Sequence, residues 1–144
     1  MVDVNGIAGL IGRIREKANA LLEKELNRRG IKGIVPAHGA VLAFLLRQTK
    51  PVPIKAVVEN VRRVKSTVTV TVSTLEKHGY VHKFPSETDA RVTYVELTAK
   101  GRRLQKDFEE ISRLLLAKFY GDMHEKARER LVRQLDRIEA NLNS

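Results

Sequence analysis

Residues 65–101, KSTVTVTVSTLEKHGYVHKFPSETDARVTYVELTAKG, decide the fold of this chain. The alternating valines and threonines at the start of the segment have strong strand propensity. Three apolar residues nevertheless recur at helical spacing, and Gly79 is of the type that ends a helix. These three residues are Val68, Val72 and Leu75. We therefore expect a helix over residues 66–78, with Ser66 as its N-cap.

A β-hairpin is expected directly after this helix. Residues 80–84 read as a short apolar strand, residues 85–90 as a polar turn and residues 91–97 as an alternating strand. Thr98 then opens a new helix. Helix, hairpin and helix in this order indicate a winged helix-turn-helix. That fold commonly places the helix in the major groove of DNA and the hairpin against the minor groove.

The sequence before this segment predicts three further helices. Residues 7–29 carry apolar side chains at three- and four-residue steps and stop at Gly30. Pro36 suits the first turn of a second helix, which ends near Gln48. Residues 50–53, KPVP, read as a rigid connector to a third helix, which ends at the turn made by Arg62 and Arg63.

The sequence after the hairpin predicts two long helices. Apolar residues from Leu104 to Phe119 and again over residues 131–142 step by three and four, which is typical of coiled-coil seams. Gly121 breaks the pattern, and Asp122 is placed to cap the last helix. The expected fold class is therefore mainly α, an α+β winged helix with about six helices and a wing of two or three strands.

The charge of the chain is concentrated on the winged helix-turn-helix segment. The 144 residues carry a net charge of +10, and residues 45–103 alone hold 12 basic and 5 acidic side chains. Such a local excess favours a polyanionic partner. There is no cysteine, and no apolar run approaches the length that spans a bilayer. We therefore expect a cytoplasmic protein without a membrane partner.

The residues of the wing resemble the MarR family of transcriptional regulators. The family pattern, D-x-R followed by a strand and then L-T-x-x-G-R, stands here as Asp89-Ala90-Arg91 and Leu97-Thr98-Ala99-Lys100-Gly101-Arg102. Residues 65–69, 75–77 and 79–81 resemble the recognition helix of the family and its exit, and residues 36–38 resemble the start of its second helix. The order of elements matches over nearly the whole chain.

The resemblance implies one domain over residues 1–144, with a DNA-binding part at 36–102 and dimerisation helices at 1–30 and 104–144. It implies a homodimer that binds a pseudo-palindromic double-stranded DNA operator, usually as a repressor. The dimerisation residues would be Ile7, Leu10, Ile14, Phe119, Leu131, Leu135, Ile138 and Leu142. The DNA-binding residues would be Lys65, Ser66, Thr67, Thr69, Val70, Ser73, Asp89, Arg91, Arg62, Arg63 and Lys83.

Three of these positions can be interpreted in physical terms. A wing arginine such as Arg91 suits a narrow A·T-rich minor groove, and Asp89 is placed to orient it by a bidentate pair. Val70 stands where the family often has arginine. A valine cannot donate a hydrogen bond to guanine but can contact a thymine methyl group, so base readout is expected to be weak or to favour A·T pairs.

A small-molecule effector is the remaining partner that the resemblance implies. It would bind in the crevice between the second helix and the dimerisation helices, where His38 is a candidate contact. No Ser/His/Asp spacing, glycine-rich phosphate loop or paired acid motif stands out, so neither catalysis nor a cofactor is expected. A metal site is not expected either, because His78 and His82 would not share a helix face. Two alternatives stay open: a winged-helix module for protein interaction, and a weakly specific architectural DNA binder.

Overall fold

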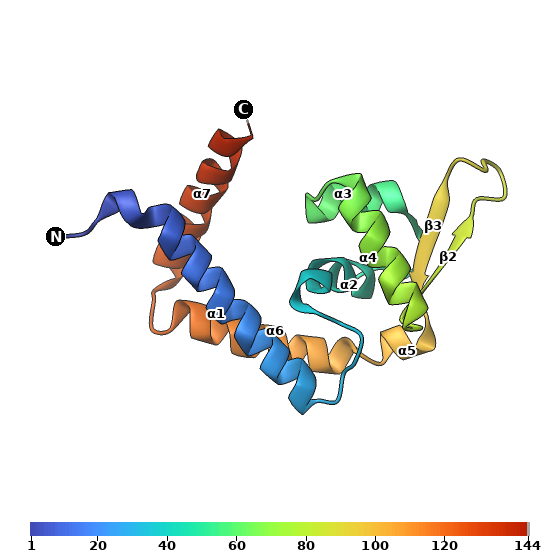
Figure 1. The fold of residues 1–144 in the computed structure, drawn as a ribbon, viewed down its shortest axis with the longest axis horizontal. Helices are drawn as coiled ribbons and strands as arrows, with labels where there is room; N and C mark the ends of the chain where they lie inside the picture. The colour runs from blue at the N-terminus through green and yellow to red at the C-terminus, as the bar shows by residue number, and fades with distance from the viewer. Residues whose placement is uncertain (144) are drawn as a thin grey trace. The chain divides into compact units, whose positions relative to one another are not determined.

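The computed structural model describes residues 1–143 and divides into two compact units, Met1–Ile111 and a second that begins at Ser112. Figure 1 shows the elements of both. Within the described residues, six helices have at least two turns, and α5 has one. The elements are η1 (Val4–Gly6), α1 (Ile7–Arg28), η2 (Pro36–His38), α2 (Gly39–Leu46), β1 (Val52–Pro53), α3 (Ile54–Val61), α4 (Lys65–Lys77), β2 (Val81–Pro85), β3 (Thr93–Leu97), α5 (Ala99–Arg102), α6 (Gln105–Tyr120) and α7 (Glu125–Leu142).

The core of the first unit is aliphatic and is shared by helices α2, α3 and α4 and the sheet. Leu42, Val57, Val72, Leu75 and Val95 have no exposed surface. The end of α1 joins this core through Leu26, and the start of α6 joins it through Ile111. These contacts fix α4 to the body of the unit and leave its opposite face uncovered.

The sheet is antiparallel, with strand order β1-β3-β2. In the β2–β3 hairpin, Val81 faces Leu97 and Pro85 faces Thr93. The short strand β1 pairs Val52 with Val95, so the expected rigid connector at residues 50–53 is in part a strand. The hairpin projects away from the helices of the unit in Figure 1, which presents its turn to solvent.

Helix α4 begins one residue earlier than predicted, and Ser66 is not its N-cap. The cap position belongs to Val64, which has extended backbone (φ −66°, ψ 149°) and provides no side-chain hydrogen bond. The prediction was wrong because Arg62, in the left-handed region at φ 53°, turns the chain early. Helix α4 therefore starts with Lys65, and Ser66 lies in its exposed first turn.

Two other predicted boundaries also differ. The cap of α7 is His124, not Asp122, because Asp122 still belongs to the turn that follows Gly121. The second wing strand begins at Thr93, which leaves Arg91 in the turn at the tip of the wing. Thr98 is confirmed as a helix cap, since its hydroxyl accepts a hydrogen bond from the Gly101 amide at 3.2 Å.

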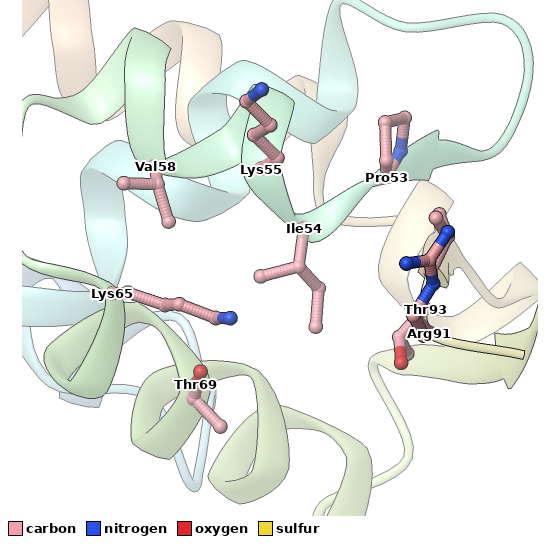
Figure 2. Close-up of a pocket in the computed structure, with 9 residues that line it drawn as sticks. Pro53, Ile54, Lys55, Val58, Lys65, Thr69, Arg91 and Thr93 are labelled. Atoms are coloured by element: carbon pink, nitrogen blue, oxygen red, sulfur yellow. The ribbon is translucent and has the colours of Figure 1, made fainter.

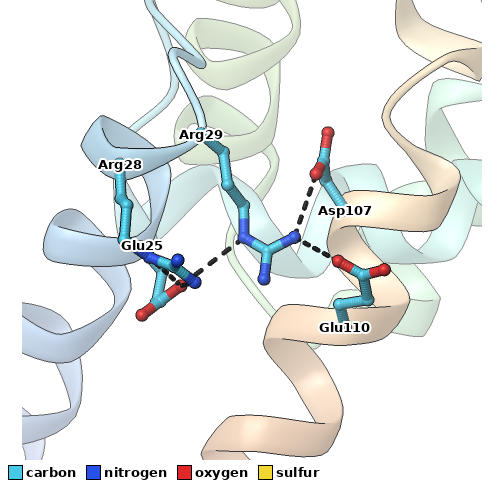
Figure 3. Close-up of polar contacts among 5 residues, drawn as sticks. All are labelled: Glu25, Arg28, Arg29, Asp107 and Glu110. Atoms are coloured by element: carbon cyan, nitrogen blue, oxygen red, sulfur yellow. Dashed lines mark hydrogen bonds and ion pairs between the residues drawn. The ribbon is translucent and has the colours of Figure 1, made fainter.

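A half-buried arginine ties the end of α1 to the start of α6 (Figure 3). The Arg29 side chain is 16% exposed and lies 3.0 Å from Asp107 and 3.5 Å from Glu25. It also pairs with Glu110, which is the main reason that the pKa of Arg29 is raised. Arg28 contacts Glu25 at 2.8 Å and is the main cause that lowers the pKa of this carboxyl group. This network ties the end of α1 to the first two turns of α6.

The glycine of the L-T-x-x-G-R segment is required by close packing. A Cβ atom at position 101 would overlap the carbonyl oxygen of Tyr80, and the Leu97 side chain would lie 2.9 Å away. Because backbone cannot move aside cheaply, Gly101→Ala should lower the free energy of unfolding by about 1–3 kcal/mol. Chemical denaturation measures this change. Gly12→Ala is the control because no atom lies within 4 Å of a Cβ there, and equal effects of the two substitutions would contradict the packing argument.

No helix among residues 1–143 is long and apolar enough to cross a membrane.

Candidate nucleic-acid interface

The outward face of α4 gathers five of the predicted contact residues. Lys65, Ser66, Thr67, Thr69 and Val70 are all exposed, whereas the helix buries its Val68 and Leu75 side chains. This segregation follows from the 3.6-residue period, which turns alternate parts of the Val–Thr run inward and outward. The exposed residues occupy the first two turns of the helix, and the free backbone amides of the first turn lie at the same end.

Two further predicted residues, Ser73 and Lys83, hold each other in place. The Lys83 amino group donates a hydrogen bond to the Ser73 hydroxyl at 2.9 Å, and the Lys83 backbone amide donates to Glu76 at 2.8 Å. These bonds link α4 to β2. The pair is therefore engaged within the protein and serves to fix the wing against the helix.

Asp89 and Arg91 form the expected bidentate pair at the tip of the wing. The Arg91 Nε and Nη2 atoms lie 3.1 and 3.2 Å from the two carboxylate oxygens of Asp89. The Arg91 backbone amide donates to the same carboxylate at 3.0 Å. These contacts lower the pKa of Asp89, the side-chain bond from Arg91 first, so this carboxyl group is ionised at neutral pH. Since the Arg91 side chain is 90% exposed, it is oriented and still accessible.

A hollow of about 550 Å³ lies between the wing and α4. Figure 2 shows the Lys65 and Ile54 side chains extending into it, with Thr69 beside them and Arg91 across from them on the wing. Lys55, from α3, also lines the hollow, although its amino group points away from the centre. The fold thus brings together three basic residues that are up to 36 positions apart in the sequence. The sequence indicated Lys55 only as a weaker phosphate candidate, because its place beside the wing depends on the pairing of β1 with β3.

Arg62 and Arg63 follow α3 and are both exposed. Arg62 is the one non-glycine residue with positive φ in the described part of the chain. A side chain in this region costs about 1 kcal/mol that glycine avoids. The turn therefore carries an arginine at a position where the backbone alone would favour glycine.

Arg62→Gly should separate stability from ligand binding. Because the strain is relieved, we expect the free energy of unfolding to rise by about 0.5–1 kcal/mol. If the Arg62 side chain contacts phosphate, the affinity for DNA should fall, and the slope of log K against log salt should lose about one unit. Thermal unfolding and a salt titration measure both effects. An unchanged salt slope would remove Arg62 from the interface, and Arg137→Ala on α7, which removes a charge without breaking the helix, is the control for the loss of charge.

A second hollow, of about 260 Å³, lies between α1 and the winged helix. Its wall combines apolar side chains such as Val41 and Val68 with the basic residues Arg15 and Arg63. His38 is not among the residues that line it. Instead, the His38 Nδ1 atom accepts a hydrogen bond from the Val35 amide at 3.3 Å, which gives this histidine a structural contact.

Because Nδ1 of His38 is an acceptor, protonation of the ring would break the bond to Val35. Burial, and then the nearby His78, lower the pKa of His38. The folded protein therefore binds this proton less readily than the unfolded chain. The contribution of neutral His38 to the free energy of unfolding is fully present above the ordinary histidine pKa of about 6.5, and it is lost as the pH falls below that value.

We expect the midpoint temperature of thermal unfolding to decrease when the pH is lowered from 7.5 to 5.5. The substitution His38→Gln should make this decrease smaller. His82→Gln is the matched control because the His82 side chain is 60% exposed. The same pH dependence in the His38 variant as in the unaltered protein would contradict this role. Scanning fluorimetry across the pH range is sufficient.

The terminal helices present uncovered apolar residues. On α1, Ile7, Leu10 and Ile14 are 42–49% exposed. In the second unit, Phe119 and Leu142 are exposed, as are Leu131 and Leu135, and Ile138 is half-buried. Every predicted dimerisation residue thus keeps a substantial accessible surface in the single chain. Within residues 1–143, no group of three or more histidine or acidic side chains could hold a metal ion.

Comparison with known proteins places the fold. Residues 36–101 match the winged helix DNA-binding domain family. The structure of the S. aureus MepR–DNA complex superposes with a TM-score of 0.81 at 17% identity, covering 93% of this chain and 96% of that one. A MarR transcriptional regulator from Methanosarcina mazei Go1 gives 0.74 at 20% identity, with 98% and 92% covered.

A third similar structure is that of Bordetella bronchiseptica BpsR, whose DNA binding is regulated by 6-hydroxynicotinic acid. It gives a TM-score of 0.74 at 19% identity, with 92% and 98% of the two chains covered. No curated protein matches the sequence. The chain therefore has a winged helix fold, and over nearly its whole length that fold is the one found in MarR-family regulators. The resemblance carried by the wing residues is confirmed at the level of the fold.

Proposed function

We propose that this protein is a homodimeric, sequence-specific DNA-binding transcriptional regulator. The observation that carries the proposal is the surface made by the exposed half of α4 and the wing, where Lys55, Lys65 and Arg91 surround one hollow. Cations on a recognition helix and on a wing suit the phosphates and the minor groove of a duplex. The net charge of +10 supports the same partner. In this role the protein binds and does not catalyse.

The uncovered apolar residues of α1 and α7 support a dimer of identical chains. A two-fold dimer places two copies of α4 in successive major grooves, so the operator has two half-sites related by a pseudo-dyad. The DNA complex of the similar S. aureus protein supports DNA as the partner. Because a dimer carries two linked winged helices, the two together bind DNA more tightly than one of them would, even though each surface has few cations.

The second hollow supports control by a small molecule. Arg15 and Arg63 would bind an anionic group, while the apolar wall would bind a ring or a short chain. BpsR, which has a similar fold, responds to an aromatic acid. An effector of this kind changes DNA binding only if it binds more tightly to the dimer at one distance between the two winged helices than at another.

A salt titration against two DNAs tests the function. The protein first selects bound fragments from genomic DNA, and its affinity is then measured for a selected fragment and for a random duplex. We expect tighter binding to the selected fragment, with both affinities falling as salt rises. Equal affinities would favour the architectural DNA binder. No binding to either duplex would favour the protein-interaction module.

A further inference from the structure

The exposed face of α4 has a composition that is unusual for a surface that reads bases. Val70 is 66% exposed, and its exposed neighbours on the helix are Lys65 and three residues with hydroxyl groups. Between residues 65 and 75 there is no arginine, asparagine, glutamine, aspartate or glutamate. The side chains that make bidentate hydrogen bonds to guanine or adenine are therefore absent from this stretch, except for Lys65.

The amino group of Lys65 lies away from the centre of this face. It is the first residue of α4, and its amino group extends sideways into the hollow between the helix and the wing (Figure 2). In that position it suits a phosphate or the rim of the groove. The centre of the exposed face is left to Thr69 and Val70.

Val70 has no role in the fold that explains its presence. The other valines in the middle of the helix, Val68 and Val72, are 1% and 0% exposed and build the core. Val70 carries the same β-branched cost in a helix without any compensating burial in this chain. An exposed polar residue would fold equally well, so the methyl groups of Val70 are available for a partner.

The major groove offers one apolar group, the C5-methyl of thymine. We propose that Val70 is a specificity-determining residue that packs on this methyl group in each half-site, so the operator carries T·A at the contacted position. The inference rests on the proposed DNA-binding function and identifies the thymine methyl as the group that the exposed face of α4 recognises. The wing agrees with it, because an accessible arginine such as Arg91 suits a narrow minor groove, the form that A·T-rich sequence adopts.

Base substitution that changes only the methyl group tests the inference. In the fragment that the protein selects, each thymine of a half-site is replaced in turn by uracil. At the contacted position the affinity should fall about fourfold, which corresponds to about 0.8 kcal/mol for one methyl-sized apolar group. Replacement by cytosine should cost at least as much, whereas 5-methylcytosine, which restores the methyl group in the same place, should bind within about twofold of thymine.

Val70→Ala shows whether this residue makes the contact. Alanine favours the helix, so folding is preserved, and thermal unfolding confirms it. The variant should bind the thymine operator about fourfold more weakly and lose its sensitivity to uracil at that one position. Val4→Ala, which alters a valine that is 74% exposed in η1, is the matched control.

The outcomes separate the two levels of the proposal. Specific binding that is insensitive to uracil at every thymine, or a Val70→Ala variant that keeps its sensitivity to uracil, would overturn the role of Val70 and leave the regulator intact. Failure to enrich any DNA would overturn the proposed function and the role of Val70 with it.

Discussion

Replacing Leu135 and Ile138 with glutamate should convert the protein from a dimer into a monomer and lower its affinity for the operator by about 10²–10⁴-fold. Leu135 is 42% exposed and Ile138 half-buried in the single chain, so neither contributes much to its own fold. In a dimer, the same positions would bury carboxylates in an apolar seam without partners. The loss of affinity follows because a single winged head no longer gains from its linked copy.

Sedimentation equilibrium measures the change of mass, and fluorescence anisotropy measures the affinity. Arg137→Glu is the matched control, since it changes the net charge by the same two units on another side of α7. If the double variant remains a dimer, the seam on α7 is not the interface. If it becomes a monomer with unchanged affinity, one head is sufficient for binding.

The second large effect is expected at the wing. Arg91→Ala should weaken operator binding by about 1–3 kcal/mol and leave the dimer intact, because the guanidinium is 90% exposed and its one carboxylate partner is Asp89 at the wing tip. The energy comes from a cation in the negative potential of a narrow minor groove. Arg91→Lys should recover only part of it, since an ammonium group cannot keep both bonds to Asp89.

Asp89→Asn separates orientation from charge. It retains Arg91 but removes the carboxylate whose oxygens hold it at 3.1 and 3.2 Å. We expect a loss smaller than that of Arg91→Ala, visible mainly on operators with A·T pairs under the wing. Operator binding that Arg91→Ala does not change would exclude the wing from the interface.

Helix α4 shows how far the sequence carries the fold. Its run of valine and threonine favours a strand locally, yet the spacing of Val68, Val72 and Leu75 predicted a helix, and burial of all three explains why the helix wins. The end at Gly79 was predictable too, because φ is +83° there and glycine alone adopts this angle without strain. Periodicity over several turns is therefore a stronger signal than the propensity of single residues.

The features that the sequence did not predict depend on contacts between distant residues. Strand β1 is two residues long, too short for any period, and exists because Val52 pairs with Val95. The start of α4 depends on the left-handed turn at Arg62, which no residue preference indicates. Arg29 meets Asp107 across 78 positions. The hollow between α4 and the wing arises in the same way, which is why the sequence indicated Lys55 only as a weaker phosphate candidate and did not place it beside Lys65 and Arg91.

The measurement that tests the central claim most directly is a hydroxyl-radical footprint on a DNA fragment selected by the protein. A two-fold dimer with α4 in the major groove and Arg91 in the minor groove predicts two protected half-sites centred about 10–10.5 base pairs apart. Minor-groove protection by the wings should flank them symmetrically. A footprint without two symmetric half-sites would contradict a two-fold dimer on DNA. So would the absence of any protection at a protein concentration that is high enough to bind random duplex DNA.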